Sequence, residues 1–66
     1  MIKLTLKDIS TNKEFTKEYS QLRQARTLLI RIYYGNKLDI IEFITDYPEE
    51  YAEVSYWYNR IKIKRR

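Results

Sequence analysis

The stretch SQLRQARTLLIRIYYG, residues 20–35, is the part of the sequence whose apolar residues recur with clean helical spacing. Residues three or four positions apart share one face of an α-helix, so this spacing predicts an amphipathic helix that covers the apolar faces of neighbouring elements. The apolar stripe consists of Leu22, Ala25, Leu29 and Ile32, widened by Leu28 and Tyr33. We expect Ser20 to cap the start of this helix and Gly35 to end it in the left-handed conformation.

Two strands are predicted before this helix. Ile2, Leu4 and Leu6 alternate with polar residues, and Phe15 and Tyr19 do the same further on. Such alternation is typical of strands with one buried face and one face in water. Residues 8–13 between them are rich in Asp, Ser, Thr and Asn, which favour turns, so we expect a hairpin. On its wet face we expect pairs of opposite charge among Lys3, Lys7, Lys17, Glu14 and Glu18.

The segment LDIIEFIT, residues 38–45, follows the helix and is dense in β-branched and aromatic residues. This density predicts a central strand that is buried on much of both faces. The alternation slips at Ile40-Ile41, and such a slip indicates a β-bulge.

The last third of the chain, residues 48–63, allows two interpretations. The alternation of Val54, Tyr56 and Tyr58 among mediocre helix formers favours a strand. Pro48 with two following glutamates favours a helix start, and the terminal Lys/Arg cluster suits a helix end. We expect one α+β domain spanning residues 1–66, with the order ββαββ and one helix across an antiparallel sheet. The alternative is ββαβα with a C-terminal helix.

Composition excludes several classes of site. The chain has no cysteine and no histidine, so disulfides and the usual zinc sites are excluded, and we expect no metal and no cofactor. No apolar run approaches the ~20 residues that cross a bilayer, and the start at Met1 begins a strand-like alternation in place of a signal peptide. We therefore expect a cytoplasmic protein without a membrane contact.

Catalytic parts are also lacking. Hydroxyl groups have no histidine as a base, there is no thiol, and the single glycine forms no phosphate loop. Six carboxylates lie between Asp39 and Glu53, but a strand would point Asp39 and Glu42 to opposite faces. We expect a protein that is not an enzyme and has no catalytic residues.

Charge is arranged in blocks. Residues 1–37 carry eight Lys/Arg and three Asp/Glu, residues 38–59 carry six acids and no base, and residues 60–66 carry five bases. The block charges of +5, −6 and +5 sum to the net charge of +4. Two interpretations stay open, either opposite charges paired across a sheet or a polarised surface with a basic end for a partner.

Two groups of residues are candidates for binding. Aromatic residues are too numerous for a small core, and Tyr, Trp and Arg are enriched in interface hot spots. The candidate aromatic surface consists of Tyr34, Tyr56, Trp57 and Tyr58. Basic residues beside aromatic ones also suit nucleic acid or an acidic partner, although cations can equally protect an edge strand from pairing. These residues are Arg60, Lys62, Lys64, Arg65 and Arg66, of which the first three would form one stripe on a strand.

The chain resembles the short proteins encoded by phages and prophages of low-GC Gram-positive bacteria. The resemblance rests on the opening segment IKLTL (residues 2–6), the segment TNKEFTKEY (residues 11–19) and a composition rich in Lys, Ile and Tyr and poor in Ala. It implies a role by stoichiometric contact, such as binding a host enzyme or defence complex, or regulating phage transcription. It implies no functional residues.

Two functions are therefore carried forward. The first is a non-enzymatic binding protein that contacts a host or phage protein, as a phage accessory or counter-defence factor in the host cytoplasm. The second is a small basic protein that binds nucleic acid, with affinity that falls steeply as salt rises. A second copy of the chain is a further candidate to cover the aromatic residues, as a homodimer.

Overall fold

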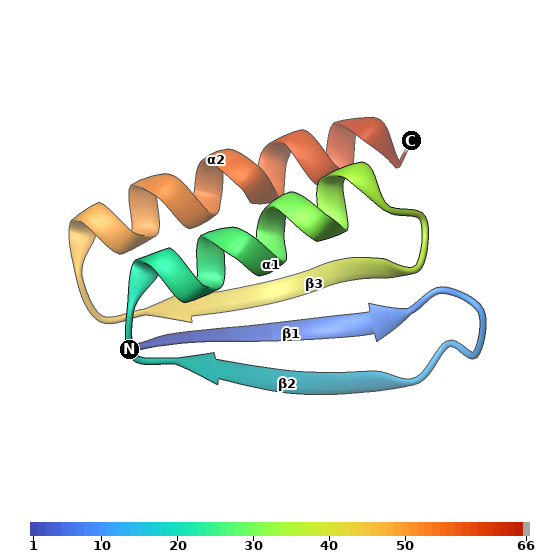
Figure 1. The fold of residues 1–66 in the computed structure, drawn as a ribbon, viewed down its shortest axis with the longest axis horizontal. Coiled ribbons are helices and arrows are strands. Elements are labelled where there is room, and N and C mark those ends of the chain that lie inside the picture. Colours follow the sequence, from blue (N-terminus) through green and yellow to red (C-terminus); the bar gives the residue numbers. More distant parts are fainter. Residues whose placement is uncertain (66) are drawn as a thin grey trace.

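Five elements make up the fold, which a computed structural model describes for residues 1–65. In chain order they are β1 (Ile2–Asp8), β2 (Glu14–Tyr19), α1 (Leu22–Tyr34), β3 (Leu38–Thr45) and α2 (Pro48–Lys64). The strands form one antiparallel sheet in the order β2-β1-β3, and the helices run side by side in the same direction (Figure 1). The α+β class is confirmed. The predicted fourth strand is wrong, and the alternative order ββαβα is correct.

The last element is a helix because burial follows helical spacing there. Val54 and Ile61, seven residues apart, are 0% and 1% exposed, whereas Ile63, which a strand would place on the same face as Ile61, is 64% exposed. Pro48 stands at the first helical positions, where its missing N–H costs nothing. The buried carboxylate of Glu50 accepts a hydrogen bond from the Asp46 amide at 3.3 Å, which tethers the chain just before the helix. Packing therefore overrides the weak helix propensity of this segment.

The central strand is β1, so the prediction of a central position for residues 38–45 is wrong. Ile2, Leu4 and Leu6 of β1 are fully buried beneath the helices, and β3 lies at the edge of the sheet. Residues 38–45 are apolar because α2 packs along β3 and buries its side chains on the face of the sheet that the helices cover. The predicted bulge is confirmed, since Thr5 pairs with Glu42 and Leu6 with Ile40, which leaves the residue between them unpaired.

The hairpin places opposite charges across from each other on the face that the helices leave open. Lys3 stands opposite Glu18 and Lys7 opposite Glu14 in the β1–β2 register, although neither pair is within ion-pair distance among the described residues. The predicted pairing of Lys17 is wrong, because Lys17 stands opposite the buried Leu4 and so belongs to the other face. A cation in that position on an edge strand opposes pairing with further strands.

Both predicted ends of α1 need correction. The residue before the first turn is Gln21, not Ser20, and it makes no side-chain cap. Gly35 has an extended backbone with φ −92°, not a left-handed one. A Cβ atom at Gly35 would lie 2.8 Å from the Arg31 carbonyl oxygen, which accepts a hydrogen bond from the Gly35 amide. Glycine is therefore suited to this position by close backbone approach.

The turn between β1 and β2 is built on Asp8, and its stability should depend on pH. The Asp8 carboxylate accepts hydrogen bonds from the Ser10 hydroxyl at 2.7 Å and amide at 2.9 Å, which lower the pKa of Asp8 below its ordinary 3.8. Because the pKa of Asp8 is lower in the folded protein, the ionised carboxylate stabilises the fold at pH values above the ordinary pKa. This stabilisation is lost as the pH falls through the pKa of Asp8 in the folded protein. We expect Asp8→Ala to lower the free energy of unfolding at neutral pH.

Urea unfolding of the wild type and Asp8→Ala at neutral pH and at a pH well below 3.8 tests this expectation. The difference between the two proteins should shrink at the acidic pH. A difference that stays constant would show that the carboxylate charge does not stabilise the turn.

Candidate binding surface

The basic residues at the end of α2 divide between two sides of the helix. A strand would have put Arg60, Lys62 and Lys64 in one stripe, and that prediction is wrong because the segment is helical. Residues four positions apart share a side of a helix, so Arg60 and Lys64 lean together toward α1. Lys62 points instead toward β3, where its Nζ lies 3.3 Å from an Asp39 carboxylate oxygen.

An aromatic group lies where the last turn of α1 meets α2. Tyr33 makes edge contacts with Tyr34 and Trp57, with ring centroids 4.9 and 5.7 Å apart. Trp57 makes a further edge contact with Tyr56 at 5.4 Å. Four rings from two helices thus form one chain of contacts in geometries that suit their quadrupoles.

Two cations lie against these rings. The Arg60 guanidinium carbon is 4.9 Å from the Tyr33 centroid and 5.4 Å from that of Tyr56, and Arg60 donates a hydrogen bond to the Tyr33 hydroxyl at 3.1 Å. The Lys64 ammonium is 4.7 Å from the Tyr33 centroid and also donates to the Tyr33 carbonyl oxygen. Among the described residues, neither cation forms an ion pair. The aromatic–cation surface is defined as Tyr33, Tyr34, Tyr56, Trp57, Arg60 and Lys64.

This surface is open to solvent and hollowed. Tyr34 is 72% exposed and Tyr56 is 53% exposed. A hollow of about 310 Å³ is lined by Tyr33, Arg60, Ile63 and Lys64. Its walls consist of an aromatic ring, an aliphatic side chain and two positively charged side chains. The hollow therefore suits a ligand group that has both a negative charge and an apolar part.

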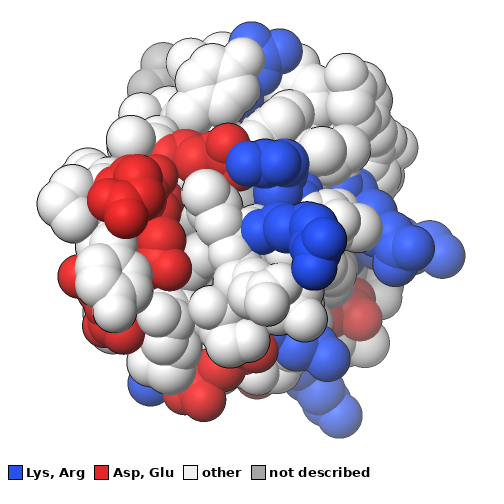
Figure 2. All heavy atoms as spheres, turned by 60° about the vertical axis from the view of Figure 1, so that its left-hand side comes forward, with Lys and Arg blue, Asp and Glu red and all other residues white. Residues whose placement is uncertain are grey.

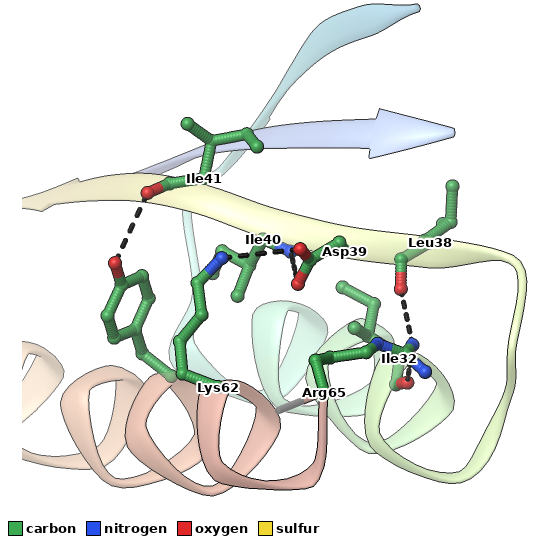
Figure 3. Close-up of polar contacts among 8 residues, drawn as sticks. Ile32, Leu38, Asp39, Ile40, Ile41, Lys62 and Arg65 are labelled. Atoms are coloured by element: carbon green, nitrogen blue, oxygen red, sulfur yellow. Dashed lines mark hydrogen bonds and ion pairs between the residues drawn. The ribbon is translucent and has the colours of Figure 1, made fainter. Parts of the chain in front are cut away.

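Tyr58, predicted with this aromatic group, lies elsewhere. Its ring packs on Phe43 of β3 with centroids 5.3 Å apart, and its hydroxyl donates to the Ile41 carbonyl at the bulge at 3.3 Å. Lys62 lies over the same ring at 5.6 Å. Figure 3 shows Lys62 reaching from α2 to Asp39 of β3, and the hydrogen bond accepted by the Ile41 carbonyl oxygen. Tyr58 and Lys62 therefore hold α2 against an edge strand.

Arg65 is also engaged inside the molecule. Its Nη2 donates to the carbonyl oxygens of Leu38 at 2.6 Å and Ile32 at 3.1 Å (Figure 3). It also donates to the carbonyl oxygen of Gly35 at 3.2 Å. The guanidinium thus joins α2 to the end of α1 and to the start of β3. Arg66, the last of the predicted basic contacts, lies outside the described residues.

The charge blocks of the sequence coincide with the helix dipoles. Glu49 and Glu50 lie in the first turn of α2, whereas Arg31 of α1 and Lys62 and Lys64 of α2 lie in the last turns. Helix N-termini favour anions and C-termini favour cations, and both helices end at the same end of the molecule (Figure 1). Figure 2 shows acidic and basic side chains gathered on different sides of the view. Charges at both ends of α2 and Arg31 at the end of α1 therefore complement the helix dipoles, whereas the first turn of α1 has no acidic residue.

The two sequence-predicted groups are each only partly brought together. The structure gathers Tyr34, Tyr56, Trp57, Arg60 and Lys64, and it separates Tyr58, Lys62 and Arg65. The central member, Tyr33, was assigned to the apolar stripe of α1. Its contacts with Trp57, Arg60 and Lys64 require α2 to be a helix, so the strand interpretation of residues 48–63 concealed them.

Comparison with known proteins adds no assignment, because no family model, curated protein or solved structure matches this chain. Within residues 1–65, no three acidic side chains gather to hold a metal ion. Neither helix in this part of the chain has the length and apolarity needed to span a bilayer.

Proposed function

We propose that this protein is a non-enzymatic binding protein that contacts a protein partner through the aromatic–cation surface. The observation that carries the proposal is the grouping of four rings around two cations on one exposed surface. Aromatic residues and arginine are enriched in interface hot spots, where aromatic side chains remove large areas from water. An acidic segment with apolar side chains is the partner chemistry that this surface complements.

The biological setting of the proposal is a phage or prophage of a low-GC Gram-positive bacterium. It is supported by the resemblance of residues 2–6 and 11–19 and of the composition to proteins of that kind. A protein that acts by stoichiometric contact needs a binding surface and no catalytic group. We therefore propose a phage accessory or counter-defence factor that binds a host or phage protein in the host cytoplasm.

Affinity capture from a lysate of such a host tests the proposed surface. The immobilised wild type should retain a specific protein, and the double variant Tyr34→Ala/Arg60→Ala should retain it at least about tenfold less well. Tyr34 is 72% exposed, so truncating it removes contact area without opening the core.

The matched control is Tyr47→Ala, which removes a 56% exposed tyrosine just before α2, at the opposite end of that helix. It should capture the partner as well as the wild type does. If all three proteins capture the same partner equally well, the aromatic–cation surface is not the binding surface.

A second function, nucleic-acid binding, is favoured by one observation. Arg60 and Lys64 stand beside the exposed rings of Tyr56 and Tyr34, and cations next to exposed rings suit phosphates next to unpaired bases. Titration of labelled DNA and RNA at low and moderate salt decides between the two functions. Binding that falls steeply with salt and is lost in Arg60→Gln/Lys64→Gln would replace the first proposal, and no binding at low salt would exclude the second.

A further inference from the structure

The outward face of α2 carries a stripe that no element of the described chain covers. Its members are Ala52, Tyr56, Asn59 and Ile63, all exposed, and we name them the outer stripe. Tyr56 and Ile63 leave 53% and 64% of their surface in water. The opposite face of α2 supplies Val54 and Ile61 to the core, to which the outer stripe contributes no residue.

The spacing of the outer stripe is that of a helix that pairs with another helix. Steps of four, three and four residues place its members at alternating a and d positions of a heptad. The helix is about 26 Å long at ~1.5 Å per residue, so the stripe extends along most of its length. Tyr56 also belongs to the aromatic–cation surface, and Ile63 lines the hollow of that surface.

Charge on α2 selects the direction of pairing. Glu49 lies exposed in its first turn, and Arg60 and Lys64 lie exposed near its end, where neither forms an ion pair among the described residues. A parallel neighbour of the same sequence would bring like charges together at both ends, whereas an antiparallel one would bring opposite charges together. The helix is therefore complementary to itself when one copy is reversed.

We propose that two copies of this chain pair through their outer stripes, with the two α2 helices antiparallel about a twofold axis. Antiparallel a–d packing then places Ala52 against Ile63 of the partner subunit, a small residue against a large one. Tyr56 lies against Asn59 of the partner subunit, whose amide can bond the tyrosine hydroxyl. Such an interface is isologous and closes at two copies.

The area of the proposed interface indicates how tightly the two copies should bind each other. One helix face buries less than the 1,200–2,000 Å² that is typical of stable interfaces, so the dimer should form at about micromolar concentration. Sedimentation equilibrium of the full chain over a wide range of concentrations should show a monomer–dimer transition. A wild type that stays monomeric at every concentration would overturn the proposal.

A charge-swap series tests which residues meet. Ala52→Lys and Ile63→Glu should each weaken dimerisation at least about tenfold, since each places a charge against an apolar partner. The double variant Ala52→Lys/Ile63→Glu should recover most of the affinity through two symmetric ion pairs. The two positions are about 16 Å apart along one helix, so they cannot pair within a chain. A double variant no better than either single variant would overturn the antiparallel register.

The matched control is Ile44→Glu, which makes the same change at a 56% exposed isoleucine on β3, away from α2. It should leave dimerisation unchanged, and equal weakening by Ile44→Glu and Ile63→Glu would overturn the proposal. Ile63 lines the hollow of the aromatic–cation surface, whereas Ala52 is not part of that surface. Loss of the dimer in Ala52→Lys with retained capture of a host protein would therefore separate this inference from the proposed function.

Discussion

Ile61→Ala is expected to lower the free energy of unfolding by about 2–5 kcal/mol, whereas Ile63→Ala should change it by less than about 0.5 kcal/mol. Ile61 is 1% exposed within the core formed by both helices and the sheet, so truncation leaves a cavity there. Ile63 is 64% exposed on the outer face of α2. The substitution is the same at both positions, so the difference reports burial alone.

Urea unfolding followed by circular dichroism measures both values, at protein concentrations low enough to keep the chain monomeric. The loss at Ile61 is large against the roughly 5–15 kcal/mol that holds a typical domain folded, and this chain is at the small end. Ile61→Ala should therefore be partly unfolded at room temperature. Equal losses at the two positions would indicate the alternating burial of a strand and would contradict the helical α2.

Local pattern was enough to predict the first two thirds of the fold. The alternation at Ile2, Leu4 and Leu6 and the helical stripe through Leu29 both match the buried sets of β1 and α1. The bulge after Ile40 was also visible, because a one-residue slip in alternation has a single simple cause. Each of these signals is carried by neighbouring residues within one element.

The identity of the last element could not be decided in the same way. Residues 48–63 contain both a two-residue and a helical spacing, and only packing on the finished core selects one of them. Val54 and Ile61 belong to a core that also contains residues of β1, α1 and β3, which local sequence does not reveal. The wrong prediction of the strand order has a similar cause. The residues of β3 are as apolar as those of a central strand because α2 packs on β3, although β3 lies at the edge of the sheet.

The sequence predicted which residues form the candidate site. It did not predict how they are arranged, because the strand interpretation of residues 48–63 is wrong. Tyr34, Tyr56, Arg60 and Lys64 were named from composition and meet on one surface only because residues 48–64 are helical. Arg65 was named for the same reason and is instead bonded to three carbonyl groups. The charge of a residue in the sequence does not show whether its side chain faces a binding partner or the end of a helix in the same chain.

Arg65→Met is accordingly expected to lower the free energy of unfolding by about 2–3 kcal/mol, although Arg65 belongs to a basic terminal cluster. The change removes the donor shared by the Ile32, Gly35 and Leu38 carbonyl oxygens and keeps most of the apolar stem. These groups lie where α1 ends and β3 begins, and the end of α1 carries the negative end of its dipole. Removing the guanidinium leaves these carbonyl oxygens, at the negative end of the α1 dipole, without the hydrogen bonds and the positive charge of Arg65.

Thermal and urea unfolding of three variants test the role of Arg65 and its geometry. Arg65→Lys keeps the charge but reaches fewer carbonyl groups, so it should fall between the wild type and Arg65→Met. Arg31→Met is the control, because it removes an exposed arginine in the last turn of α1 and should cost less than about 1 kcal/mol. If Arg65→Met is as stable as the wild type but binds a partner less well, Arg65 belongs to the binding surface and does not hold α2 in place.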